Sequence, residues 1–275
     1  ILNPLLEVIM KNFFILLLAI SCVVVLYWGN SHWKERTVLS TDATTQETTK
    51  TAEPTEVAQE TDKRIDIEEF QKISANWPAE AKRRFEQTLL EGIPYKILLA
   101  GSTALGSNDD GWASTAKKKL EETFGEGSIE VDIQVFDGTS MEFSDQDKVS
   151  EMIAAEADLI VLEPFTLQDN SFVRIEDSHA HITNWISAVK EKNPDTVFIL
   201  QPPNPIYDAN YYLVQIEELE KFAETNDIPY LNHWSAWPST DSEEIIPYLN
   251  EENEAPSKKG HELWSKYVTD FFISK

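Results

Sequence analysis

The chain has 275 residues, of which 41% are apolar and 26% charged, enough for a hydrophobic core and unlike a disordered chain. Its 48 acidic residues outnumber its 23 lysines and arginines, and the formal net charge of −25 repels nucleic acid phosphates and anionic lipid surfaces. The single cysteine, Cys22, excludes an internal disulfide and a thiolate metal cage. We therefore expect a folded acidic protein with no nucleic acid partner.

The N-terminal part of the sequence is strongly apolar, with an uncharged run from Phe13 to Trp28. A membrane-spanning helix takes about 20 apolar residues, whereas the apolar core of a cleaved signal takes about 7 to 15 and ends at small residues. This run continues past Cys22 without a small-residue cleavage site. We expect residues 1–30 to form a membrane anchor or uncleaved signal. A cleaved signal, or a lipoprotein lipidated at Cys22, is the alternative.

Residues 31–63 have a different composition. The stretch from Thr37 to Asp62 is rich in threonine and has almost no large apolar side chain and no hydrophobic period. Such a segment cannot bury a core and is typical of an extended tether. A threonine-rich tether beside an apolar anchor indicates a domain exposed outside the cytoplasm, at the cell surface. An ordinary cytoplasmic linker is the alternative.

From residue 64 to residue 275 the sequence alternates short β-rich runs with longer amphipathic stretches. Five strands are expected, over Tyr95–Ala100, Ile129–Phe136, Leu159–Leu162, Thr196–Gln201 and Ile228–Leu231. Helices are expected around Gly111–Phe124, Lys148–Ala157, Glu176–Lys192, Tyr211–Asn226 and Lys259–Phe272, with one or two more within Ile65–Leu90. Strands joined by helical crossovers predict a parallel sheet covered on both faces, which is a three-layer α/β/α fold.

Ligands of an open parallel sheet bind beyond the carboxyl ends of its strands. After the first expected strand the sequence reads Gly101-Ser102-Thr103-Ala104-Leu105-Gly106. Glycine permits the close backbone approach that a sharp strand-to-helix turn needs if it is to present a hydroxyl. Neither a Walker pattern nor a GxGxxG dinucleotide pattern is present. Taken alone, this turn is equally compatible with a plain structural turn.

Taken in order, the segments after the strands resemble those of the SGNH/GDSL hydrolases, a superfamily of esterases and lipases. The resemblance spans roughly residues 95–272 and rests on the motifs ILLAGSTALG, DGTS, LEPFTLQDN, ILQPPNPIY and APSKKGHELW. It implies a flavodoxin-like α/β/α fold with a Ser-His-Asp type site, acting on an ester substrate without a cofactor or a metal ion.

The resemblance also implies positions for the nucleophile and the oxyanion site. It places the family's nucleophile on Thr103. Threonine is the poorer attacking group there, so we expect Ser102 to attack if the turn shifts by one residue, with Thr103 as the alternative nucleophile and a turn or helix cap as the alternative role of Ser102. The family's oxyanion glycine corresponds to Gly138. Its oxyanion asparagine falls in a stretch that offers Gln168, Asp169 or Asn170.

The last motif departs from the family's pattern. Alignment through Pro256 and Gly260 places Ala255 where the family has its catalytic histidine, and Glu252 where it has an aspartate. A hydroxyl is a weak nucleophile at neutral pH without a base to take its proton. We expect His261 to be the substitute base, with Glu252 orienting its imidazole.

The other histidines have plainer interpretations. His233 lies between aromatic residues after the last strand and is expected to be a hydrogen-bonded packing residue, with a catalytic role as the alternative. His179 and His181 lie in a helical stretch and are expected to be solvated. Two histidines with one intervening residue are only a weak metal signal.

Two functions are compatible with these features. The first is a membrane-tethered, extracytoplasmic esterase that removes an acyl or O-acetyl group from a cell-envelope glycan or lipid, through an acyl-enzyme. The second is an SGNH-like module that has lost the triad and binds a surface polymer or a partner protein. Ala255 separates them, because the binding function is expected if no histidine approaches Ser102 or Thr103.

Overall fold

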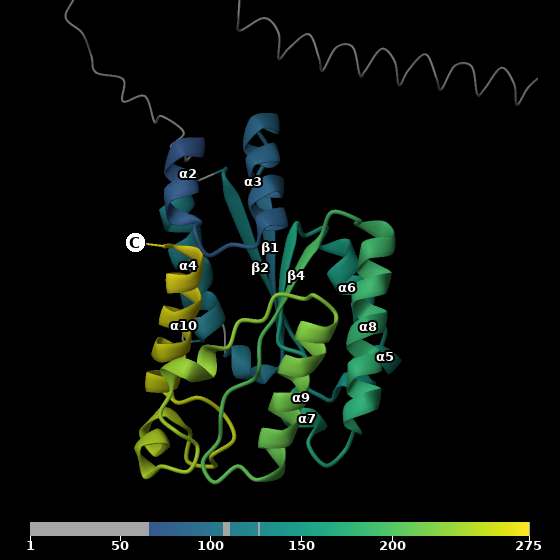
Figure 1. Cartoon of the computed structure of the whole chain (residues 1–275), viewed down its shortest axis with the longest axis vertical. Helices are drawn as coiled ribbons and strands as arrows, with labels where there is room; N and C mark the ends of the chain where they lie inside the picture. The colour runs from purple at the N-terminus through teal and green to yellow at the C-terminus, as the bar shows by residue number, and fades with distance from the viewer. Residues whose placement is uncertain (1–65, 107–110, 126, 275) are drawn as a thin grey trace, which may run out of the picture. The chain divides into compact units, whose positions relative to one another are not determined.

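The computed structural model describes residues 66–106, 111–125 and 127–274 (Figure 1). The expected anchor, residues 1–30 with Cys22, and the expected tether, residues 31–63, lie outside the described residues. Among the helices that are described, none is both long enough and apolar enough to cross a membrane.

Parallel strands form the central sheet of the described chain. The strands are β1 (Tyr95–Gly101), β2 (Ile129–Val135), β3 (Leu159–Leu162) and β4 (Val197–Leu200). They lie in the order β2-β1-β3-β4, and every neighbouring pair is parallel. The predicted parallel sheet of an α/β fold is therefore confirmed.

The fifth strand expected at Ile228–Leu231 is reduced to a single parallel bridge between Leu200 and Tyr230. The Leu200 amide donates to the Pro229 carbonyl (2.8 Å), and the Leu231 amide donates to the Leu200 carbonyl (2.7 Å). Pro229 has no amide hydrogen, so the pairing does not extend toward the start of β4. The expectation of five strands was wrong: within the described residues the sheet has four.

Helices cover both faces of this sheet (Figure 1). One face packs against α2 (Ile67–Ile73), α3 (Ala79–Glu91), α4 (Trp112–Phe124) and α10 (Lys258–Phe272). The other packs against α5 (Ser140–Asp145), α6 (Val149–Ala154), α8 (Ile175–Lys192) and α9 (Tyr211–Thr225). The predicted helices are thus confirmed, with α2 and α3 both formed within the region expected to hold one or two.

An apolar core lies on each face of the sheet, and the alternation of side chains along the strands explains both. Successive side chains of a strand point to opposite faces, so an uninterrupted apolar run supplies both layers at once. Ile97 and Leu99 of β1 belong to the core under α4 and α10. Leu98 and Ala100 belong to the core under α6, α8 and α9. β1 is therefore buried on both faces up to its carboxyl end.

Short helices that the sequence analysis did not predict follow the strands. They are α7 (Thr166–Asp169) and the 3₁₀ helices η2 (Thr103–Leu105), η3 (His233–Ala236) and η4 (Glu243–Tyr248); the six-residue α5 was also not predicted. A capping box begins α5: the Glu142 amide donates to the Thr139 hydroxyl, and the Glu142 carboxylate accepts from the Thr139 amide (2.8 Å). The Thr-x-x-Glu pattern was the sequence signal for this helix.

Candidate active site

The turn after β1, residues 101–106, carries both candidate nucleophiles, and we call it the hydroxyl turn. Ser102 is completely buried, and its Oγ accepts a hydrogen bond from the Ala104 amide (3.2 Å), which caps η2. Thr103 is the first residue of η2 and is exposed. The structure therefore uses the Ser102 hydroxyl inside the turn and presents Thr103 at the surface.

Gly106 closes the hydroxyl turn in a conformation that only glycine adopts readily, with φ of +93°. A Cβ at this position would lie 2.2 Å from Gly111 Cα and 3.0 Å from Cε1 of His261. The turn thus folds back onto the start of α4, in direct contact with α10.

Replacement of Gly106 by alanine is expected to lower the free energy of unfolding by about 2 kcal/mol or more, because the side chain meets backbone at a positive φ. Urea denaturation measures this loss. Gly92→Ala is the matched control, since Gly92 ends α3 at φ of +70° and tests the positive φ alone, at about 1 kcal/mol. Equal losses in the two variants would show that crowding at Gly106 contributes nothing.

Glu163 follows β3 directly and packs against the hydroxyl turn. Its completely buried carboxylate accepts hydrogen bonds from the Ser102 amide at Oε2 (2.7 Å) and from the Phe165 amide at Oε1 (3.0 Å). Gly101 leaves the space for it, because a Cβ there would lie 2.9 Å from Oε2. Burial raises the pKa of Glu163 to about 7, although the hydrogen bonds from Ser102 and Phe165 lower it. The sequence analysis missed this residue.

Asp169 joins the segments that follow β2 and β3. Its Oδ1 accepts a hydrogen bond from the Ser140 amide (2.7 Å), so the end of α7 is tied to the start of α5. Asp169 is 1% exposed, and burial raises its pKa, against the lowering effect of Ser140 and Ser178. Asp169 therefore joins the two segments, and its contact with an oxyanion stays a prediction.

Amide side chains flank Asp169. Oε1 of Gln168 and Oδ1 of Asn170 are buried, and neither has a hydrogen-bond partner within the described residues. These oxygens are acceptors, so the groups able to donate to an oxyanion are Nε2 of Gln168 and Nδ2 of Asn170. Gly138 lies on the neighbouring segment, half-buried at φ of +155°. Because Asp169 ties these two segments together, the structure brings together the Gly138 segment and the Gln168–Asn170 segment that sequence analysis proposed for the oxyanion site.

A serine and histidine contact lies in the same region, between α5 and α8. Ser140 Oγ is 2.9 Å from His181 Nδ1. Ser140 is completely buried, so its hydroxyl is closed to a substrate and the contact holds the two helices together. His181 is half-buried, and His179 stacks on Phe222 with ring centroids 4.6 Å apart. The expectation that both histidines are solvated was therefore wrong. In the described chain no cluster of metal-binding side chains is found.

His261, the expected base, lies near the start of α10 and reaches the end of the hydroxyl turn at Gly106. Its Nδ1 accepts a hydrogen bond from the Trp112 amide (3.3 Å). In a neutral imidazole, one nitrogen accepts and the other carries the proton. With Nδ1 as acceptor the proton resides on Nε2, so His261 accepts a further proton only at Nδ1, after release of Trp112.

Glu252 does not supply the expected support for His261. It is exposed in a turn and has no hydrogen bond or ion pair within the part of the chain described. The neighbouring Asn253 instead holds the loop against the segment after β4: its Oδ1 accepts from the Tyr207 amide (2.8 Å) and its Nδ2 donates to the Tyr207 carbonyl (2.9 Å). Ala255 lies in this loop, with its carbonyl accepting from the Asn250 amide (2.8 Å).

His233 is a packing residue, as expected. It is completely buried, with Nε2 2.8 Å from the Pro202 carbonyl oxygen and Nδ1 accepting from Trp237 Nε1 (3.0 Å). Its ring stacks on Trp264 with centroids 4.0 Å apart. Burial lowers the pKa of His233 to about 3, so the ring is neutral at physiological pH.

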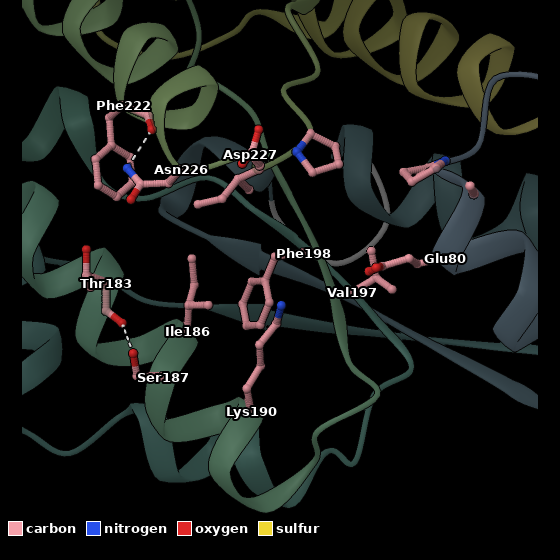
Figure 2. A pocket seen from close by; sticks show the side chains of 14 residues that line it. Glu80, Thr183, Ile186, Ser187, Lys190, Val197, Phe198, Phe222, Asn226 and Asp227 are labelled. Atoms are coloured by element: carbon pink, nitrogen blue, oxygen red, sulfur yellow. Dashed lines mark hydrogen bonds between the residues drawn. The ribbon is translucent and has the colours of Figure 1, made fainter.

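A groove of about 390 Å³ lies elsewhere on the fold (Figure 2). Ile186 and Lys190 of α8, Phe198 of β4 and Phe222 of α9 are among the residues that line it. None of the lining residues belongs to the hydroxyl turn, to the Gly138 segment or to α7. This groove is therefore separate from the candidate active site.

Solved structures with a similar fold include proteins named for the GDSL family and an acetylxylan esterase. A protein named for the lipolytic G-D-S-L family, from Desulfitobacterium hafniense, matches 64% of this chain and 98% of its own at 18% identity, with a TM-score of 0.54. A GDSL-like lipase from Parabacteroides merdae matches 65% and 95% at 12% identity, with a TM-score of 0.55. A catalytic mutant of the acetylxylan esterase Axe2 from Geobacillus stearothermophilus matches 65% and 94% at 15% identity, with a TM-score of 0.51.

The chain therefore has the fold of the SGNH/GDSL hydrolases, as the order of its motifs predicted. No family model and no curated protein sequence matches it. Likeness at this identity concerns the fold, so the function is argued from the residues of the site.

Proposed function

We propose that this chain is an ester hydrolase of the SGNH kind, with Thr103 as its nucleophile. The observation that carries the proposal is the hydroxyl turn, where Thr103 is exposed at the carboxyl end of a strand buried on both faces. Ser102 is the alternative nucleophile, but its hydroxyl is buried and caps η2. The resemblance to the family likewise assigns the nucleophile position to Thr103.

The proposed reaction proceeds through an acyl-enzyme. Thr103 Oγ1 forms a bond to the ester carbonyl carbon, its proton passes to Nδ1 of His261, and the alcohol leaves after receiving that proton. Water then releases the acid and regenerates Thr103. The side-chain amides of Gln168 and Asn170 and the backbone near Gly138 are proposed to stabilise the oxyanion. The imidazole must first release the Trp112 amide, which predicts slow turnover.

The finer proposal concerns location and substrate. We propose a bacterial surface enzyme, tethered to the membrane through residues 1–30, that removes an acyl or O-acetyl group from an envelope glycan or lipid. The apolar run and the threonine-rich stretch of the sequence support the location. The likeness to Axe2, named an acetylxylan esterase, supports a small acyl group. Resistance to carbonate extraction and protease sensitivity on intact cells test the location.

The nucleophile is tested with the full chain in a detergent that contains no ester, using p-nitrophenyl acetate and an O-acetylated glycan. Thr103→Ala is expected to lower kcat/KM by about 10³-fold or more, without loss of stability because Thr103 is exposed. Thr103→Ser, which keeps a hydroxyl, is expected to retain activity.

Ser102→Ala is the matched control for the neighbouring hydroxyl. It removes the cap of η2, so we expect a loss of about 1 kcal/mol in the free energy of unfolding and retained hydrolysis. Hydrolysis that survives in Thr103→Ala but disappears in a folded Ser102→Ala would transfer the nucleophile to Ser102.

A second function is favoured by the state of His261. Its Nδ1 is bound to the Trp112 amide, Ala255 stands at the family's histidine position, and Glu252 is exposed in a turn. A module of this kind binds a surface polymer or a partner protein without cleaving it. Wild-type turnover no greater than that of Thr103→Ala on both esters would favour this second function over hydrolysis of these esters.

A further inference from the structure

Glu163 connects the two halves of the candidate site through one side chain. Its Oε2 is bound to the Ser102 amide in the hydroxyl turn, and its Oε1 is bound to the Phe165 amide at the start of α7. Phe165 lies in the left-handed region at φ of +63°, a conformation that a bulky residue adopts only when its surroundings hold it there. α7 in turn carries Gln168 and ends at Asp169.

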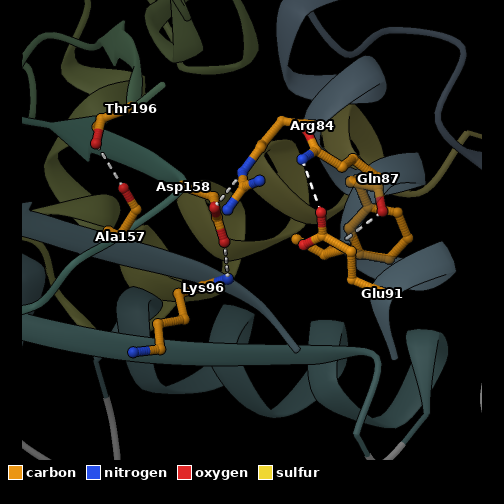
Figure 3. A network of polar contacts seen from close by, with 9 residues as sticks. Arg84, Gln87, Glu91, Lys96, Ala157, Asp158 and Thr196 are labelled. Carbon is orange, nitrogen blue, oxygen red and sulfur yellow. Dashed lines mark hydrogen bonds and ion pairs between the residues drawn. The ribbon is translucent and has the colours of Figure 1, made fainter. Parts of the chain in front are cut away.

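The opposite end of the same strand pair has a comparable carboxylate. Asp158, just before β3, accepts a hydrogen bond from the Lys96 amide of β1 at Oδ2 (2.8 Å) and one from Arg84 Nε at Oδ1 (2.6 Å) (Figure 3). Asp158 is therefore neutralised by a cation, whereas Glu163 accepts from the backbone amides of Ser102 and Phe165 and from the Ser102 hydroxyl. Both carboxylates join β1 to β3, but only Glu163 lies at the carboxyl ends of the strands.

We propose that Glu163 is the positioning residue of this site, with its ionised carboxylate holding the nucleophile turn and the oxyanion segment in one fixed arrangement. This inference rests on the proposed function. Two amide donors need two acceptor oxygens, and only the ionised carboxyl offers both oxygens as pure acceptors. Protonation converts one oxygen into a donor, which weakens one of the two bonds.

The surroundings of Glu163 place this change near neutral pH. Burial is the largest influence and raises the pKa of Glu163 to about 7, with a further increase from Asp169 of α7. The Ser102 and Phe165 hydrogen bonds oppose this effect. From α9, Tyr212 faces the same region, and its own pKa is raised by burial first and then by Glu163. The site is therefore expected to tighten as the pH rises through about 7.

Glu163→Gln in the full chain tests the proposal, because glutamine keeps the volume but presents only one acceptor oxygen. We expect the ratio of wild-type to variant kcat/KM to rise from near 1 at pH 6 to about 10-fold or more at pH 8. We also expect hydrogen exchange at the Ser102 or Phe165 amide to accelerate by about 10-fold or more at pH 8. A ratio that is constant with pH, with unchanged exchange at both amides, would overturn the proposal.

Asp158→Asn is the matched control, since it weakens the other carboxylate bridge between β1 and β3. It is expected to accelerate exchange at Lys96 and to leave Ser102, Phe165 and the pH profile unchanged. A pH profile altered equally by Asp158→Asn would show a general structural effect and overturn the positioning role.

The exchange measurement separates failure of this inference from failure of the proposed function. If the wild-type chain cleaves no ester, faster exchange at Ser102 or Phe165 in Glu163→Gln still supports the tie between the two turns. Unchanged exchange at both positions refutes the tie, whatever the activity.

Discussion

Replacement of Trp264 by alanine is expected to lower the free energy of unfolding by about 3–5 kcal/mol. Trp264 is completely buried in α10, stacked on Trp112 (centroids 4.7 Å apart) on α4 and on His233 (4.0 Å). Its Nε1 also donates to Gln201 Oε1 (3.1 Å), at the end of β4. The alanine variant loses both stacks, leaves a large cavity and removes the partner of a buried amide.

Urea denaturation at pH 7 measures the Trp264→Ala loss. Trp234→Ala is the control, because Trp234 is half-buried and donates one hydrogen bond, to the Pro203 carbonyl. We expect it to lose clearly less stability than Trp264→Ala. A loss below about 1 kcal/mol in Trp264→Ala would contradict the central position of this stack.

Acidification is expected to destabilise the chain through His233. Burial lowers its pKa to about 3, whereas an unfolded histidine has a pKa of about 6.5. The unfolded chain therefore binds more protons, so stability is greatest above about pH 6.5 and falls as the pH decreases toward 3. The slope is about 1.4 kcal/mol per pH unit, and the whole effect is on the order of 5 kcal/mol.

His233→Phe isolates this contribution. At pH 7 the variant is expected to be less stable, because Trp237 Nε1 and the Pro202 carbonyl lose their partner. The unfolding free energies of the wild-type chain and of His233→Phe should converge from pH 7 to pH 4, because phenylalanine does not titrate and only the wild-type chain loses the contribution of His233. Parallel curves would show that the pKa of His233 is the same in the folded and the unfolded chain. His179→Gln is the control, because half-buried His179 has a pKa lowered by burial and a shallower effect is expected.

Between about pH 4 and pH 7, Glu163 changes the stability in the opposite direction to His233. Its pKa is raised to about 7 in the folded chain and is about 4.3 when unfolded, so the folded chain binds the extra proton between these values. Stability from this group is therefore greatest at low pH and is lost as the pH rises from about 4 to 7. The wild-type curve contains both effects. Comparing His233→Phe and Glu163→Gln with the wild-type chain therefore separates the contributions of the two residues to the pH dependence of stability.

Local pattern was enough to predict most of the elements. Leu159–Leu162 was predicted with the observed bounds, because four consecutive buried apolar residues have one favourable place in this fold, the centre of a parallel sheet. Ile228–Leu231, which contains Pro229 and Tyr230, was also predicted as a strand but forms only one bridge. There the sequence signal failed because pairing depends on the partner edge and on Pro229, which donates no hydrogen bond.

The candidate site was only partly predictable. The motif order pointed to the hydroxyl turn, Gly138 and the Gln168–Asn170 segment, but it did not show that Ser102 is buried while Thr103 is exposed. The motif order also pointed to Glu252 as the carboxylate that orients His261, and it did not point to Glu163. Glu163 acts through backbone amides, which every residue except proline possesses, so its partners leave no trace in residue identity.

The sequence by itself determined the alternating α/β pattern, the apolar strands and the place of the hydroxyl turn, because each depends on neighbours within a few residues. Only the tertiary structure decided which charged and polar groups are buried and which amides they meet. Glu163 and Ser102 are 61 residues apart along the chain, and Asp169 and Ser140 are 29 apart. Contacts over such separations form when the strands align, and burial then sets the pKa values of the groups enclosed between them.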